Sequence, residues 1–404
     1  MKAITGSAAT VIEAIADEAA AMLAEVEAWA AINSGSRNLN GLARMADVLA
    51  DAFSVLPGEL HLVNAMPVEA IDKTGCPYVI EHGRHLHLTV RPDAPLQLLF
   101  TGHMDTVFGA DHPFQKLKWL ESGVLNGPGV ADMKGGLAVM RAALRAVEAS
   151  PLAAGIGYEV LINSDEEVGS GGSAALIARA AAGKQAAFTY EPALADGTLA
   201  GARSGSGNFA LVVRGRSAHA GRNPEEGRNA LLAAADLALR LADAAGHGLT
   251  VNPARIEGGG PNNVVPDHAV LHVNFRPGTD ADERRAQSAI DAAVAKVAAA
   301  HGVAIAVHGG FGRPPKPLDA NQLRLFSHVR ACGAELGLDI HWRDSGGVCD
   351  GNNIAACGVP VVDSMGVRGG AIHSPDEFLI VDSLVERAQL SALAVLRLTE
   401  RGLQ

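Results

Sequence analysis

Hydrophobic positions in the first half of the chain follow two different periods. Residues 85–90 (HLHLTV) alternate apolar and polar side chains, as a half-buried strand does, and residues 96–102 (LQLLFTG) form the apolar run of a fully buried strand. Residues 132–149 repeat their apolar positions at helical spacing. Further predicted elements are strands over 158–164 and 186–192 and a helix over 173–183. Strands that alternate with helices predict an α/β fold, in which helices flank a mixed or parallel sheet.

The pattern changes from about residue 205. Six elements follow in the order strand, helix, strand, strand, helix, strand, which is the ferredoxin-like α+β arrangement. The strands are predicted over 208–215, 249–259, 268–278 and 303–310, and the helices over 229–245 and 280–302. Two segments rich in Gly, Ser or Pro, GARSGSG at 201–207 and FGRPPKP at 311–317, flank this unit and are predicted to act as hinges.

After the second hinge the α/β pattern resumes. Helices are predicted over 321–336, over 352–358 and from 381, and strands over 339–342 and 359–365. A chain of 404 residues exceeds what one hydrophobic core usually supports, so two domains are expected. We therefore predict one α/β domain, formed by residues 1–204 and 315–404, that is interrupted by an inserted α+β domain of residues 205–314.

Composition narrows the class of protein. The chain is 48% hydrophobic and 19% charged, with a net charge of −11, and it has no Lys/Arg stripe, which argues against a nucleic-acid partner. No stretch approaches the roughly 20 apolar residues of a membrane span. The N-terminal residues 1–23 mix acids with apolar residues and predict an amphipathic helix, not a signal peptide. The four cysteines show no metal-binding spacing, so we expect free thiols and a cytoplasmic location.

Ligand-type residues follow the ends of the predicted α/β strands. They are His103, Asp105, Asp132, Glu166, Glu167, Glu191 and His373. Singly, each has an ordinary explanation: a helix N-cap for Asp132, a solvated loop for the acids, a capping or core role for His373. Together they are expected to meet, because ligands of α/β sheets gather at the carboxyl ends of the strands.

This set of nitrogen and oxygen donors, without a thiolate, favours a pair of zinc ions, with cobalt or manganese as substitutes. Metal charge also explains the adjacent glutamates of Asp165-Glu166-Glu167, since divalent cations would neutralise them. A structural calcium site is the alternative, but calcium prefers cages made only of oxygen, and the two histidines disfavour it.

Seven motifs occur in order along nearly the whole chain: GHMDTVF, GPGVADMKGG, DEEVGSGGS, YEP, SAHAG, NNVVP and IHSPDEF. In this order they resemble the zinc-dependent metallopeptidase family of glutamate carboxypeptidase, aminoacylase, acetylornithine deacetylase and succinyl-diaminopimelate desuccinylase. RSAHAGRNPEEGRNAL and GRPPKP are most similar to the bacterial glutamate carboxypeptidase branch. One departure is GPG, where many relatives carry Gly-Arg-Gly. The resemblance implies a zinc-exopeptidase-like α/β domain with an inserted lid that also dimerises.

The resemblance also implies roles for individual residues. Asp132 would bridge two metals, and Glu166 would be the general base. The remaining ligands would be His103 and Glu191 at one metal and Glu167 and His373 at the other. Asp105 would hold the ring of His103 from behind. The peptide bond between Asp132 and Met133 is expected to be cis.

Further residues would act on the substrate. His219 would be an oxyanion donor that reaches the active site of a partner subunit, so the resemblance implies a functional homodimer. Asn263 and Arg276 would bind the carboxylate or carbonyl of the substrate, and an arginine suits carboxylates because its fork can bond both oxygens. The remaining candidates are Arg313 for a carboxylate, Gly346 and Gly347 for close approach of backbone amides, and Cys349 as pocket lining and not as a nucleophile.

The function that follows is a dinuclear zinc hydrolase that cleaves an amide beside a free carboxylate in a small peptide or N-acyl amino acid. An N-acyl amino acid deacylase would share every metal ligand and differ only in the shape of its pocket. A catalytically silent binding protein on the same fold is a further alternative, which the complete set of ligands and base disfavours. A panel of substrates and an analysis of bound metal would separate these three.

Overall fold

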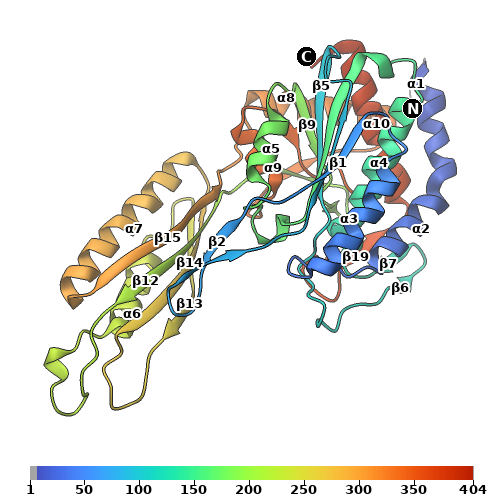
Figure 1. Ribbon diagram of the computed structural model, residues 1–404. Coiled ribbons are helices and arrows are strands. Elements are labelled where there is room, and N and C mark those ends of the chain that lie inside the picture. The colour runs from blue at the N-terminus through green and yellow to red at the C-terminus, as the bar shows by residue number, and fades with distance from the viewer. Residues whose placement is uncertain (1–6, 404) are drawn as a thin grey trace.

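The computed structural model describes residues 7–403 and contains one central six-stranded sheet (Figure 1). In spatial order its strands are β1 (Glu59–Val63), β4 (His85–Val90), β8 (Ile156–Asn163), β5 (Leu96–His103), β9 (Ala186–Thr189) and β17 (Val361–Val362). Strand β5 is parallel to both β8 and β9, whereas β4 is antiparallel to β1 and β8. The sheet is therefore mixed, as the sequence predicted.

Helices cover both faces of this sheet. Along β5, Leu98 and Phe100 belong to the large core beneath the first group of helices, whereas Leu99 belongs to a smaller core on the opposite face. Because successive strand residues point to opposite faces, a sheet buried on both sides needs a continuous apolar run. The large core includes α1 (Ser7–Ala14), α2 (Ala19–Ala30), α3 (Leu39–Phe53), α4 (Gly135–Glu148), α8 (Ala320–Glu335) and α10 (Ser383–Arg401), and the smaller one includes α5 (Ala174–Ala181) and α9 (Asp350–Ala356).

A second sheet of short strands was not predicted. Its order is β10 (Ala193–Leu194), β18 (Arg368–Gly370), β19 (Phe378–Ile380), β7 (Val124–Asn126) and β6 (Lys118–Glu121). Strands of two to four residues are too short for a period of alternation to be visible in the sequence. This sheet is important for the site because Asp132 follows β7 and His373 lies between β18 and β19.

The inserted unit has a four-stranded antiparallel sheet in the order β13-β14-β12-β15. Its elements are β12 (Ser206–Arg214), α6 (Ala230–Ala242), β13 (Leu249–Gly258), β14 (His268–Pro277), α7 (Asp280–His301) and β15 (Ala304–Arg313). It has a hydrophobic core of its own, to which both helices contribute, and it projects from the main body as an arm (Figure 1). The element order and the strand order confirm the predicted ferredoxin-like arrangement.

Two smaller pairs of strands complete the structure. The hairpin β2 (Val68–Ile71) and β3 (Pro77–Ile80) reaches the sheet of the arm, where the carbonyl of Thr74 accepts a hydrogen bond from Arg214 at 2.8 Å. The parallel pair is β11 (Leu199–Arg203) and β16 (Trp342–Ser345). The predicted strand at 339–342 is wrong, because pairing with β11 begins only at Trp342 and the preceding three residues form no strand.

Short helical turns lie at Ile15–Glu18, Ala153–Gly155 and Pro224–Glu226. Within residues 7–403, no helix is long and apolar enough to cross a membrane. All four cysteines are free thiols in the structure, as predicted.

Candidate active site

Three neighbouring parallel strands deliver candidate ligands to one edge of the central sheet. Strand β5 ends at His103, and β9 is followed, after one residue, by Glu191. Strand β8 leads into a short turn, Glu166–Val168, which begins with the two adjacent glutamates. Because β8, β5 and β9 are parallel neighbours, their carboxyl ends lie side by side, and so do these side chains.

Two loops of the second sheet supply the remaining ligands. Asp132 lies in the turn Val130–Lys134, which Gly129 enters with a φ of 73°, and its peptide bond to Met133 is cis, as the resemblance implied. His373 lies in the loop between β18 and β19 with a φ of 62°. Both loops therefore approach the edge of the central sheet from the smaller sheet.

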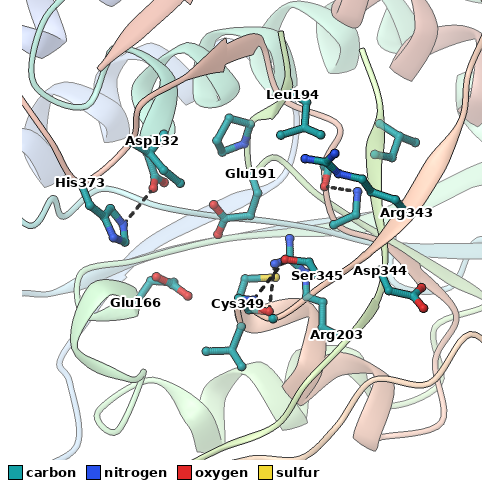
Figure 2. A pocket seen from close by; sticks show the side chains of 18 of the residues that line it. Asp132, Glu166, Glu191, Leu194, Arg203, Arg343, Asp344, Ser345, Cys349 and His373 are labelled. Carbon is teal, nitrogen blue, oxygen red and sulfur yellow. Dashed lines mark hydrogen bonds and ion pairs between the residues drawn. The ribbon is translucent and has the colours of Figure 1, made fainter. Parts of the chain in front are cut away.

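The five side chains form two triads that share one carboxylate. Figure 2 shows Asp132 joined to His373, with Glu191 nearby. In the first triad, His103 Nε2 lies 3.0 Å from Asp132 Oδ1 and 3.7 Å from Glu191 Oε1. In the second, His373 Nε2 lies 3.3 Å from Asp132 Oδ2 and 3.1 Å from Glu167 Oε2. Within each triad the ligand atoms all lie within 4.8 Å of one another. The two oxygens of Asp132 are thus divided between two sites, which is the geometry needed to bridge a pair of ions.

The electrostatics of the triads favour cations. Burial, reinforced by the charge of Asp132, raises the pKa of Glu167 to about 8 and also raises the pKa of Glu191. Burial would raise the pKa of Asp132 too, but hydrogen bonds from His103 and His373 hold it well below its usual range. Hydrogen bonds to Asp132 and Glu167 in turn raise the pKa of His373 to about 11.

Buried carboxylates gathered this closely repel one another, and added positive charge would stabilise them. The donor set of two imidazole nitrogens and carboxylate oxygens fits divalent zinc, cobalt or manganese. The triads therefore fit a dinuclear metal centre.

Asp105 connects His103 to the turn that carries Glu166 and Glu167. Its backbone carbonyl lies 3.0 Å from His103 Nδ1, and its carboxylate Oδ1 lies 3.4 Å from the same atom. The carboxylate accepts the backbone N–H groups of Glu166 and Glu167, both at 3.2 Å, and the hydroxyl of Ser36 at 2.7 Å. Asp105 thus orients the His103 ring and fixes the turn that carries both glutamates.

Glu166 lies beside the triads and belongs to neither of them. Burial raises its pKa to about 7, and the nearby charge of Arg313 opposes this rise. Arg313 Nη2 lies 2.8 Å from Glu166 Oε1 and donates to the backbone carbonyl of Glu166 and to Ser170 Oγ, each at 2.8 Å. Since Arg313 ends β15, the arm itself contributes a side chain to this site.

Sequence reasoning missed Glu377. Its buried carboxylate accepts three backbone N–H groups of the loop that carries the shared ligand: Gly129 at 3.2 Å, and Ala131 and Asp132 at 3.0 Å each. Asn126 Nδ2 donates to its backbone carbonyl at 2.7 Å. The only signal in the sequence was the acid of IHSPDEF, a motif in which the histidine drew attention.

A cavity of about 840 Å³ opens beside the triads. Four of the proposed substrate-binding residues line it: Arg276, Arg313, Gly346 and Gly347. Cys349 also lines it, and burial holds the pKa of its thiol well above its usual value, which suits lining and not nucleophilic attack.

The structure of one chain does not bring His219 or Asn263 to this cavity. Both are exposed residues of the arm, where they are neighbours: the N–H of Ala220 donates to the carbonyl of Asn263 at 3.0 Å. Any role for His219 in catalysis therefore needs a second chain or a large movement of the arm.

Comparisons with known proteins agree with this geometry. Residues 99–397 match the model of "Peptidase family M20/M25/M40", and the chain belongs to this family. It is therefore a hydrolase of the M20 metallopeptidase type.

Three similar proteins indicate how far the likeness extends. Carboxypeptidase G2 of Pseudomonas sp. (strain RS-16) is 30% identical over 318 residues, which cover 74% of each chain. Succinyl-diaminopimelate desuccinylase of Psychrobacter arcticus is 30% identical over 319 residues, covering 72% of this chain and 76% of the relative. A tripeptidase of Staphylococcus aureus has the same fold, with a TM-score of 0.73 at 21% identity, over 95% of this chain and 99% of the other.

Proposed function

We propose that this enzyme is a dinuclear zinc carboxypeptidase, which hydrolyses an amide bond beside a free carboxylate. The observation that carries the proposal is the pair of triads sharing Asp132, with the buried Glu166 beside them at the wall of a cavity. A relative named as a carboxypeptidase supports the choice of reaction.

The first metal would be held by His103, Asp132 and Glu191, and the second by Asp132, Glu167 and His373. When bound, such a pair lowers the pKa of a water molecule towards ~7 and polarises the carbonyl of the substrate. Asp105 keeps the His103 ring in place, which leaves Nε2 directed at the first site.

Glu166 is the general base of the proposed reaction. A carboxylate with a pKa of about 7 can accept a proton from water and return it to the leaving amine at neutral pH. Arg313 holds this side chain through Oε1 and holds its backbone through the carbonyl, so Glu166 is fixed before the substrate arrives. Arg313 is thereby occupied, which makes it a weaker candidate for the substrate carboxylate than Arg276.

Arg276 suits the carboxylate beside the scissile bond. Its Nε donates to Asn274 Oδ1 at 2.9 Å, and it makes no ion pair with an acid among residues 7–403. Burial and the nearby charge of Arg313 lower its pKa, so an anionic substrate would relieve this repulsion. Gly346 and Gly347, which also line the cavity, would let backbone N–H groups approach the substrate.

The chief competing function is an N-acyl amino acid deacylase, and relatives named as succinyl-diaminopimelate desuccinylases favour it. Rates on N-acyl-glutamates and folate-like compounds, compared with acetylornithine, succinyl-diaminopimelate and simple dipeptides, would separate the two. A catalytically silent binding protein would hold no metal after purification without chelator, even when zinc is added back.

We also propose that two parts of the chain form domains with different roles. Residues 1–204 and 315–404 form the catalytic domain, and residues 205–314 form a lid that dimerises. Helix α6 of the lid exposes Leu232 and Leu239, which are 61% and 68% exposed, and we propose that a second copy covers this face. Dimerisation would bring the exposed His219 of one chain to the cavity of the other as an oxyanion donor.

The replacement Glu166→Gln tests the proposed base. The variant should bind two metal ions per chain, as the wild type should, because Glu166 belongs to neither triad. Its kcat should fall by about 10²–10⁴-fold, the usual contribution of a positioned base. Metal content by elemental analysis and turnover of an N-acyl-glutamate are the two measurements. A fully active variant would remove Glu166 from the mechanism.

A further inference from the structure

The far wall of the cavity is formed by the parallel pair β11 and β16. The two strands are paired side by side, with Ala200 opposite Arg343 and Arg203 opposite Ser345. Six of their residues line the cavity: Leu199, Ala200, Arg203, Arg343, Asp344 and Ser345. In the close view Glu191 lies between His373 and Arg343, so Arg343 stands at the end of the cavity away from the second triad (Figure 2). A substrate whose carbonyl lies at the triads can extend along this wall.

Four arginines line the cavity, and two of them are already neutralised. Arg203 Nε donates to the buried Asp363 at 2.7 Å, and Arg313 is paired with Glu166 at 2.8 Å and with Asp350 at 3.5 Å. Arg276 is assigned above to the carboxylate beside the scissile bond. Arg343 is left, and within the described part of the chain it makes no ion pair and no side-chain hydrogen bond.

Two acids near Arg343 accept backbone N–H groups: Asp344, which follows it in the chain, and Asp196, which its charge reaches. Asp344 accepts the N–H of Ala202 at 3.1 Å, and its side chain points away from Arg343 in Figure 2. Asp196 accepts the N–H of Thr198 at 2.9 Å; hydrogen bonds from Thr198 are the main cause of its lowered pKa, and the nearby charge of Arg343 lowers that pKa as well. The guanidinium of Arg343, an exposed residue, therefore lines the cavity without an ion pair or a side-chain hydrogen bond inside the described part of the chain.

We propose that Arg343 is a specificity-determining residue that binds a second carboxylate of the substrate, in addition to the one beside the scissile bond. This inference rests on the proposed function. Leu194 and Leu199, which also line the cavity, would contact the methylene groups that lead to this second carboxylate. The planar fork of an arginine bonds both oxygens of such a group.

The second carboxylate has two possible sources, the free end of the acyl group or the side chain of the leaving amino acid. Two pairs of matched substrates distinguish them. N-glutaryl-glycine and its terminal amide differ only at the acyl end, and N-butanoyl-glutamate and N-butanoyl-glutamine differ only in the side chain. For each pair the measured quantity is the ratio of kcat/KM, acid over amide.

In the wild type we expect the acid-over-amide ratio of kcat/KM to exceed one for one of the two pairs. In Arg343→Ala that ratio should fall by about tenfold, as expected for the loss of one hydrogen-bonded ion pair, while Arg343→Lys should retain part of the preference. Arg330→Ala is the matched control: this exposed arginine lies 5.0 Å from the ring of Trp342, the residue next to Arg343, but it does not line the cavity. The control should keep the wild-type ratios.

Equal acid-to-amide ratios in the wild type and in Arg343→Ala, for both pairs, would overturn the inference. If none of the four substrates is cleaved, the proposed function fails. The subsite is then tested by measuring ligand binding instead of turnover. Calorimetry with zinc-loaded enzyme would then compare glutarate with butanoate. A preference for glutarate that Arg343→Ala abolishes supports the subsite, and the absence of any preference rejects it.

Discussion

At the scale of single residues, the carboxylate of Glu377 holds the loop that carries Asp132, the carboxylate shared by the two triads. Three N–H groups converge on it, and they lower its pKa, although burial and the charge of Asp132 raise the pKa to about 7 overall. A buried carboxylate is tolerated only when hydrogen bonds compensate for its lost hydration. Glu377 touches no candidate metal position itself, so we regard it as a positioning residue for Asp132.

Glu377→Gln should therefore weaken metal binding. The amide keeps one acceptor oxygen but turns an NH₂ group towards backbone N–H donors, which should displace Asp132. Loss of such a supporting contact typically costs about 10–100-fold in metal affinity, and competition with a chromophoric chelator would measure it. Asp319→Asn is the matched control, because Asp319 also accepts two backbone N–H groups, at the start of α8, far from the triads in sequence. Wild-type zinc affinity in Glu377→Gln would contradict the assigned role.

At the scale of elements, the central sheet carries a partly buried ionic cluster on one face. Glu159 of β8 lies 2.6 Å from His87 Nε2 of the neighbouring β4 and 2.8 Å from Lys184 Nζ. Burial raises the pKa of Glu159, but the hydrogen bonds from His87 and Lys184 outweigh burial, and the net pKa is lowered. The cluster therefore joins β4, β8 and the segment that precedes β9.

The lowered pKa of Glu159 predicts the direction of a pH effect. Because its pKa is lower in the folded state than in the unfolded chain, ionised Glu159 stabilises the fold above the unfolded value, near ~4.3. This stabilisation is lost as the pH falls through the folded pKa. The free energy of unfolding of Glu159→Gln, from urea denaturation, should be below the wild-type value at pH 7 and should converge with it in acid.

The exposed Glu81, which makes no ion pair among the described residues, supplies the control variant Glu81→Gln. That variant should follow the wild-type curve at every pH. A gap between wild type and Glu159→Gln that stays constant from pH 7 to acid would show that the charge of Glu159 does not matter.

The elements that the sequence predicted correctly share a physical property. Strands such as β5 and helices such as α7 are long enough to show a period, and each buries its apolar positions where the period places them. The strands β10 and β18, with two and three residues, show no period and exist only because neighbouring chain segments pair with them. The strand expected at 339–342 was displaced for the same reason: its partner β11 determined where pairing begins.

At the scale of the whole molecule, the chain crosses between the main body and the arm twice, once near Arg203 and once near Lys316. These two crossings are held together by hydrogen bonds. Arg203 and Lys316 pair through their backbones, with both N–H···O distances at 2.9 Å, and both side chains reach the buried Asp363. Asn352 donates to the carbonyls of Ser204 and Pro314, one on each crossing. These contacts place the end of β15 so that Arg313 enters the site.

The proposed dimer predicts complementation between two inactive chains. In a mixture of Glu166→Gln and His219→Ala, each mixed dimer contains one cavity with an intact Glu166 that receives an intact His219 from its partner. Random mixing should restore about a quarter of wild-type activity, since half of the dimers are mixed and each has one complete site. The measurement is activity after the two purified variants are dissociated and reassociated.

Two further outcomes qualify this test. No recovery on mixing, although each variant is dimeric, would place the action of His219 within one chain or outside catalysis. Leu239→Glu should produce monomers in analytical ultracentrifugation, whereas Leu323→Glu, at an exposed leucine of α8 in the main body, should not.

The sequence by itself determined the types of the long elements, the insertion of an α+β unit into an α/β chain, and the residue types available as ligands. Strand and helix periods depend on local burial, and strand ends in a parallel sheet share an edge, so His103, Glu167 and Glu191 were predictable neighbours.

Only the tertiary structure decided which atoms meet. Asp132 bridges the triads because its loop, anchored by Glu377, approaches from the second sheet, and Arg313 reaches Glu166 because the crossings hold β15 in place. Such contacts join segments far apart in sequence, and their distances depend on packing that no local pattern encodes. For the same reason, only the tertiary structure shows that Arg343 lines the cavity without an ion pair among the described residues, while Asp344 and Asp196 accept backbone N–H groups.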